Sequence, residues 1–169
     1  MRPRANPILE LGNHAKALQV LRQVGSTVDF AWYNAAVFDV ARRWLLLGEC
    51  HLRAAKSLEG RPREWRSVVS RAYYAAYSAS RSVRYVVTGY VKLDGRDHQE
   101  VGQLPDEFPD RALWSTFLVD LRKDRNLADY EPWRQMRLGL SRRPVDSVRE
   151  VTKFIRTAKR YLRGRGVSL

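Results

Sequence analysis

Apolar residues recur at helical spacing along most of this chain, and that spacing constrains the fold more than any other feature. Residues three and four positions apart share one face of an α-helix, whereas strand residues alternate between two faces. The spacing predicts long helices over residues 31–58, 63–90 and 110–128, a last helix from Pro144, and a short one within 12–25. In the polar connection between residues 90 and 110 we expect one further short helix, beginning near Asp97.

These helices predict an all-α fold, an up-and-down bundle of four to five helices. A chain of 169 residues with 44% hydrophobic and 11% aromatic residues is long enough to bury a core and fits one domain. We place the helical domain at residues 37–169 and a partly helical N-terminal extension at residues 1–36. Pro144 suits the first turn of the last helix, and Asp110 is the expected N-cap of the helix before it.

The net charge of +13 favours partners rich in phosphate. Arginine outnumbers lysine by 25 to six, a ratio that either guanidinium chemistry or a GC-rich genome explains. Residues 132–169 carry eleven basic and two acidic residues. Four of the basic residues form one stripe on the last helix, which is either a phosphate-contacting surface or an ordinary solvated face: Arg149, Lys153, Arg156 and Arg160.

Several classes of protein lack support in the sequence. The N-terminal "MRPRANPILE" has no apolar run behind it, and no apolar stretch is long enough to span a membrane, so we expect a cytoplasmic protein without a membrane partner. No metal-ligand spacing and no phosphate-binding glycine loop occur, so we expect no metal and no cofactor. The single Cys50 is expected to be a buried thiol.

Two segments are unusual enough to carry a function. The first is "SRAYYAAYSASR", residues 70–81, where tyrosines lie among small residues on one helix. These small residues either allow close helix packing, or the hydroxyl and guanidinium groups beside them line a site. The second is "LRKDRNLADY", residues 121–130, which is either an ordinary helix C-terminus or part of a nucleic-acid site.

Together, in this order, the two segments resemble motifs of the HEPN family, the nucleotide-binding helical domains of higher eukaryotes and prokaryotes. The resemblance covers about residues 40–164. It is closest to a bacterial subgroup with a "SRAYYAAFHAAR"-like segment, a loop histidine like that of "DHQEV" here, and an "LRxxRxxADY"-like ending. It implies a helical bundle, usually a homodimer, in which the arginine motifs of two subunits face one another in a cleft.

Many HEPN domains are metal-independent ribonucleases whose motif is Arg, four to six residues, then His. The arginine corresponds to Arg125 and the next polar residue to Asn126, but the position five beyond Arg125 is Tyr130. A tyrosine with a pKa of about 10 is only about one part in a thousand ionised at pH 7. Asp129 is a weak base unless burial raises its pKa. His98 supplies the missing imidazole if its loop folds toward the cleft; otherwise it is an exposed loop residue.

The resemblance therefore implies a protein that engages RNA or nucleotide in a prokaryotic toxin–antitoxin or phage-defence system, with ribonuclease activity left open. In this hypothesis Arg125 holds a phosphate, Asn126 orients it, Asp129 fixes Arg125, and Tyr130 donates a hydrogen bond. The nucleic-acid contacts come from the neighbouring polar residues and from the basic stripe: Ser70, Arg71, Tyr74, Arg122, Arg149, Lys153, Arg156 and Arg160. His14 and His51 lie outside the motifs and receive no role.

Two further expectations concern partners. The family precedent implies a minimal nucleotidyltransferase antitoxin, or another defence-system subunit, and Tyr130 is then a candidate acceptor for modification. The alternative hypothesis is a noncatalytic interaction or scaffold subunit of a larger nucleoprotein complex, a role that the N-terminal extension would suit.

Overall fold

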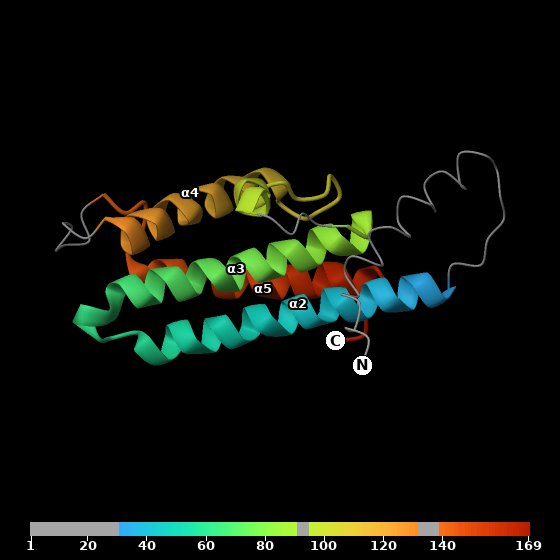
Figure 1. Cartoon of the computed structure of the whole chain (residues 1–169), viewed down its shortest axis with the longest axis horizontal. Helices are drawn as coiled ribbons and strands as arrows, with labels where there is room; N and C mark the ends of the chain where they lie inside the picture. Colours follow the sequence, from blue (N-terminus) through green and yellow to red (C-terminus); the bar gives the residue numbers. More distant parts are fainter. Residues whose placement is uncertain (1–30, 91–94, 132–138) are drawn as a thin grey trace, which may run out of the picture.

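The computed structural model describes residues 31–90, 95–131 and 139–169, and in these residues all regular structure is helical. Four α-helices follow one another, numbered from α2 as in Figure 1: α2 (Ala31–Leu58), α3 (Trp65–Thr88), α4 (Arg111–Tyr130) and α5 (Pro144–Gly164). Two short 3₁₀ helices complete the described part, η1 (Pro62–Glu64) before α3 and η2 (Gly95–Glu100) before α4. The prediction of an all-α fold is confirmed.

Successive helices run in opposite directions, so the fold is an up-and-down bundle (Figure 1). α3 lies at the centre and packs against α2, α4 and α5. Its buried face combines small residues with larger ones, which lets the neighbouring helices approach closely: Val68, Val69, Ala72, Tyr73, Ala75, Ala76, Ala79 and Val83. The close-packing interpretation of the small residues is therefore correct.

The closest approach between α2 and α3 is at Gly48. A Cβ atom placed on Gly48 would lie 2.8 Å from the backbone oxygen of Ala75, which cannot move away as a side chain can. We expect Gly48→Ala to lower the free energy of unfolding by about 1–3 kcal/mol, because α2 must shift from α3. Gly164→Ala is the control, since a Cβ atom added there, at the end of α5, would meet no atom within 4 Å. Urea denaturation of both variants tests this, and equal stabilities would contradict it.

The helix ends agree with the sequence in part. α3 ends at Gly89, whose backbone N–H donates to the carbonyl of Tyr85 in a left-handed conformation with φ of 64°. Pro144 opens α5 as predicted. Asp110 occupies the predicted N-cap position of α4, but its side chain makes no capping hydrogen bond and its φ is 52°. α4 also continues past residue 128 to Tyr130, which places the end of the second motif inside the helix.

Cys50 was predicted to be buried, but it is exposed on α2 and accepts a hydrogen bond from Arg53 at 3.0 Å. The predicted helix within residues 12–25, and most of the extension to which it belongs, lie outside the described residues. Among the helices that the structure describes, none combines the length and apolarity of a membrane span.

Candidate functional site

The two motifs meet where the N-terminal half of α3 lies beside the C-terminal half of α4. The guanidinium of Arg125 donates to the hydroxyl of Tyr74 at 2.8 Å. Its Nε lies 2.7 Å from the carboxylate of Asp129, one turn along α4, and Ser70 donates to the same carboxylate at 3.4 Å. Segments about 50 residues apart in the chain are thus brought together by one arginine.

The remaining predicted residues of the motifs surround this contact. Asn126 is exposed and accepts a weak hydrogen bond from Arg125 at 3.3 Å, and the ring centre of Tyr130 lies 4.9 Å from the Arg125 guanidinium carbon. The side chain of Tyr130 is largely in solvent, with 67% of the residue exposed. Arg71 is exposed in a polar groove of about 540 Å³ that Ser70 and Asp129 also line.

Arg122 is half-buried on α4, one turn before Arg125. Its charge partly opposes the burial that raises the pKa of Tyr73, and it adds a small contribution to the lowered pKa of His98, which burial causes first. In the described part of the chain, neither Arg122 nor Arg71 forms an ion pair with a carboxylate. Both guanidinium groups therefore have charge available for an anion.

The basic stripe on α5 is exposed as predicted, but it is partly neutralised. Arg149 pairs with Asp146 at 3.2 Å and Lys153 with Glu150 at 2.8 Å. Arg160 contacts only the hydroxyl of Thr157, at 3.5 Å, and Arg156 has no ion pair among the described residues. Within the described ranges, no hydrogen bond or ion pair joins this stripe to Arg125 or Tyr74.

His98 is not an exposed loop residue. η2 folds onto α3, so that Nδ1 of His98 lies 2.7 Å from the hydroxyl of Tyr73. The imidazole stacks on the ring of Tyr77, with 4.2 Å between ring centres, and meets the ring of Tyr74 edge-on at 6.2 Å. The interpretation of His98 as an exposed loop residue was therefore wrong. That His98 supplies the missing imidazole in a cleft stays a prediction.

Asp97 holds η2 in this position. The residue has no exposed surface, and its carboxylate accepts hydrogen bonds from Tyr77 at 2.6 Å and from Arg84 at 2.9 Å. Arg81 adds an ion pair at 3.5 Å, and its guanidinium carbon lies 4.1 Å from the ring centre of Trp44. The residue next to His98 is thus fixed by buried charges on α3.

A second histidine, His51 on α2, completes the cluster. Its ring centre lies 5.7 Å from that of Tyr74, so that Tyr74 has an imidazole on α2 and another on η2 as neighbours. No sequence pattern singled out His51, because its position beside Tyr74 depends on how α2 is aligned along α3. The periodicity of α2 predicts a helix but does not specify that alignment.

Burial determines the protonation of these groups. It is the largest cause of the lowered pKa of His51, followed by the charge of Arg71. The pKa of His98 is lowered first by burial, then by Arg125, with smaller contributions from Arg81 and Arg122, while Asp97 opposes the shift. Both imidazoles are therefore neutral at pH 7. Burial also raises the pKa of the Tyr73 and Tyr77 hydroxyls well above the ordinary value of 10, which keeps both protonated.

The histidine pKa values predict a pH dependence of stability. The unfolded chain binds protons at an ordinary pKa near 6.5, above the folded values, so the free energy of unfolding falls as the pH drops below about 6.5. Above about pH 7.5 these two groups contribute no dependence. Denaturation at pH 7.5 and 5.5 measures the loss, and the double variant His51→Gln, His98→Gln should lose less. An equal loss in both proteins would contradict the assignment.

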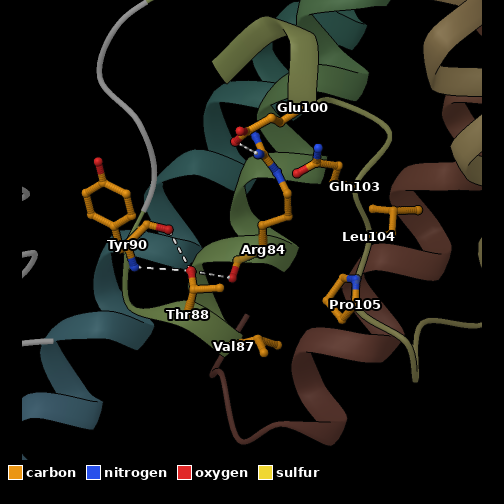
Figure 2. Close-up of a pocket in the computed structure, with 8 residues that line it drawn as sticks. All are labelled: Arg84, Val87, Thr88, Tyr90, Glu100, Gln103, Leu104 and Pro105. Atoms are coloured by element: carbon orange, nitrogen blue, oxygen red, sulfur yellow. Dashed lines mark hydrogen bonds and ion pairs between the residues drawn. The ribbon is translucent and has the colours of Figure 1, made fainter. Parts of the chain in front are cut away.

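A separate pocket of about 310 Å³ lies at the C-terminal end of α3 (Figure 2). Arg84 and Glu100 face one another in it at 3.6 Å, and its other lining residues are Val87, Thr88, Tyr90, Gln103, Leu104 and Pro105. Because Arg84 also binds Asp97, this pocket borders the buried charges that position His98.

The cluster between α2, α3, η2 and α4 offers three guanidinium groups and two neutral imidazoles. Such a set can bind a phosphate and exchange protons with it without a metal ion. Over residues 31–90, 95–131 and 139–169, no group of three His, Cys, Asp or Glu side chains is placed to hold a metal ion. Comparisons of the chain with family models, with curated proteins and with solved structures find no match.

Proposed function

We propose that this is a HEPN-like protein that binds the phosphate of RNA or of a nucleotide at the cluster around Tyr74 and Arg125. The observation that carries the proposal is the hydrogen bond from Arg125 to Tyr74, because it joins the two motifs on which the family resemblance rests. The proposed setting is a prokaryotic toxin–antitoxin or phage-defence system in the cytoplasm.

The charges around the cluster support phosphate as the ligand. Arg125 is held by Asp129, which fixes the fork of its guanidinium, whereas Arg71 and Arg122 have no carboxylate partner among the described residues. Guanidinium groups bind phosphate oxygens through paired, charge-assisted hydrogen bonds. A phosphate bound in the cluster would therefore contact the guanidinium groups of Arg71 and Arg122 without breaking an existing ion pair of either residue.

The imidazoles support cleavage as well as binding. A ribonuclease without a metal needs a group with a pKa near neutrality, which Tyr130 does not supply. His98 and His51 lie next to Tyr74 and have the required chemistry. The proposed activity is therefore a metal-independent endoribonuclease whose imidazoles come from η2 and α2 and not from the position of Tyr130.

Two proposals about partners follow from the resemblance. In a homodimer, the clusters of two subunits would face one another across a shared cleft. Tyr130 is well exposed, with its hydroxyl-bearing ring beside Arg125, and is accessible to a nucleotidyltransferase antitoxin that modifies tyrosine.

The first test is RNA binding and cleavage in EDTA. We expect a mixed-sequence single-stranded RNA to bind with an affinity that falls steeply with salt, and to be cleaved with EDTA present. Binding without cleavage would support a noncatalytic subunit of a nucleoprotein complex. Absence of both would overturn the proposed phosphate site and favour the scaffold hypothesis, in which the partner is a protein.

Arg122 provides a sharper measurement of the same site. We expect Arg122→Gln to weaken RNA binding and to reduce the slope of log affinity against log salt by about one, because one phosphate contact is lost. Lys123→Gln is the matched control: Lys123 is the next residue of α4, is exposed, and is already paired with Asp120 at 3.2 Å. Equal slopes for the two variants would contradict a phosphate contact by Arg122.

A further inference from the structure

The contact between Tyr73 and His98 restricts where the proton of the imidazole can be. The Tyr73 hydroxyl is buried, and Nδ1 of His98, at 2.7 Å, is the hydrogen-bond partner it has among the described residues. A buried hydroxyl without an acceptor costs about 1–3 kcal/mol. The lowest-energy arrangement is therefore the one in which Tyr73 donates to Nδ1.

We infer that Tyr73 holds neutral His98 in the tautomer with its proton on Nε2, so that His98 donates a hydrogen bond to the bound phosphate while His51 accepts a proton. This assignment rests on the proposed function for its phosphate and adds different roles for the two imidazoles. Tyr73 is a positioning residue, because it acts through His98.

The surroundings of His98 support one fixed tautomer. Tyr77 stacks on the imidazole but gives its own proton to Asp97 at 2.6 Å, so it does not compete with Tyr73 for Nδ1. The charged groups that act on the ring are Asp97 from η2, Arg81 from α3, and Arg122 and Arg125 from α4. The three arginines oppose protonation of His98, so the ring stays neutral and keeps one N–H donor.

His51 has the complementary properties. Neither of its ring nitrogens has a hydrogen bond among the described residues, and its ring is half-buried beside Tyr74. The charged group that acts on it is Arg71, from α3, which also opposes protonation. A neutral imidazole of this kind has a lone pair with which to accept a proton.

The proposed step on RNA is attack of a ribose 2′-oxygen on the adjacent phosphorus. His51 takes the proton of a ribose 2′-hydroxyl, and the 2′-oxygen forms a bond to the adjacent phosphorus. The bond from phosphorus to the 5′-oxygen breaks, and that oxygen takes a proton from water. The products are a 2′,3′-cyclic phosphate and a 5′-hydroxyl, and protonated His51 returns its proton to solvent. His98 and Arg125 stabilise the negative charge of the phosphorane by donating hydrogen bonds.

The tautomer is tested by nitrogen-15 NMR of the protein labelled at histidine. In the wild-type protein above pH 7.5, we expect the His98 signals of a ring protonated at Nε2. Tyr73→Phe should convert His98 to a mixture of tautomers. The matched control is Tyr85→Phe, because Tyr85 is also fully buried on α3 but its hydroxyl has no hydrogen-bond partner among the described residues. A wild-type ring protonated at Nδ1, or a Tyr73→Phe spectrum like that of the control, would overturn the assignment.

The two roles are tested by the rate of RNA cleavage in EDTA. We expect His51→Gln to lower the rate by about 10²–10⁴-fold with RNA affinity unchanged, and to remove the fall in rate at acidic pH. His98→Gln should weaken RNA binding and leave that acidic fall in place. If wild-type protein binds RNA without cleaving it, the role of His51 is overturned while the tautomer stands. If inorganic phosphate and RNA both fail to shift the His98 signals, the proposed phosphate site itself fails.

Discussion

Asp97→Asn is expected to lower the free energy of unfolding by about 3–5 kcal/mol, the largest loss that any single substitution in the described residues should cause by removing charge. The buried carboxylate is the partner of two arginines whose side chains are only 9% exposed, Arg81 and Arg84. Asparagine keeps the size of the side chain and a hydrogen-bonding oxygen for Tyr77. It removes the negative charge that both guanidinium groups face in the core, while Arg84 keeps its contact with Glu100 at 3.6 Å.

Asp106→Asn is the control for Asp97→Asn. Asp106 also pairs with an arginine, Arg111, at 3.3 Å, but its side chain is 87% exposed. Exposed ion pairs contribute about 0–1 kcal/mol, so its stability should scarcely change. Thermal and urea denaturation measure both variants. A loss below about 1 kcal/mol for Asp97→Asn would mean that water reaches the buried charges, and that η2 is not held as the contacts indicate.

The order and type of the helices followed from the sequence because each apolar stripe is local information. Residues three or four apart share a face whatever the partner is, and this predicted α2 to α5 with small errors at their ends. Which members of a stripe become buried depends on the partner helix. Some apolar residues at the helical spacing of these stripes are exposed for this reason: Leu47, Val87, Leu113 and Val145. Cys50 was misplaced in the same way.

The same distinction, between contacts within one helix and contacts between helices, applies to the candidate site. The pairing of Arg125 with Asp129 is an i, i+4 contact within one helix, so its spacing was visible in the sequence. The resemblance to a family placed Ser70 and Tyr74 next to that pair, and the structure brings them together. His51 could not be found, because its place depends on the alignment of two helices.

The face of α3 that carries Tyr73, Tyr77 and Arg81 shows a further limit. On a helical wheel drawn from the sequence, these polar residues line a surface beside the alanine stripe. In the structure η2 covers this face, and all three residues are buried against Asp97 and His98. A short 3₁₀ helix has too few residues for a periodic signal, so its docking onto α3 is tertiary information.

Arg125→Ala is expected to lower the rate of RNA cleavage by about 10²–10³-fold, the usual cost of removing one donor that stabilises a transition-state charge. Arg125 is the residue that contacts both motifs, since it donates to Tyr74 and pairs with Asp129. Alanine removes the guanidinium fork that is proposed to bind phosphate, and it leaves Tyr74 and Asp129 without their shared partner. Arg125→Lys retains the charge but not the fork, and it should restore most of the binding and little of the rate.

The control for Arg125→Ala is Arg163→Ala, which removes the same charge from an exposed position near the end of α5. If Arg125 acted only through the positive field of the protein, both variants would weaken RNA binding equally and both effects would vanish at high salt. A positioned guanidinium instead predicts a rate loss for Arg125→Ala that persists under saturating RNA. Single-turnover cleavage at saturating RNA separates the two cases, with circular dichroism to establish that each variant is folded. Equal rates in the two variants would remove Arg125 from the reaction.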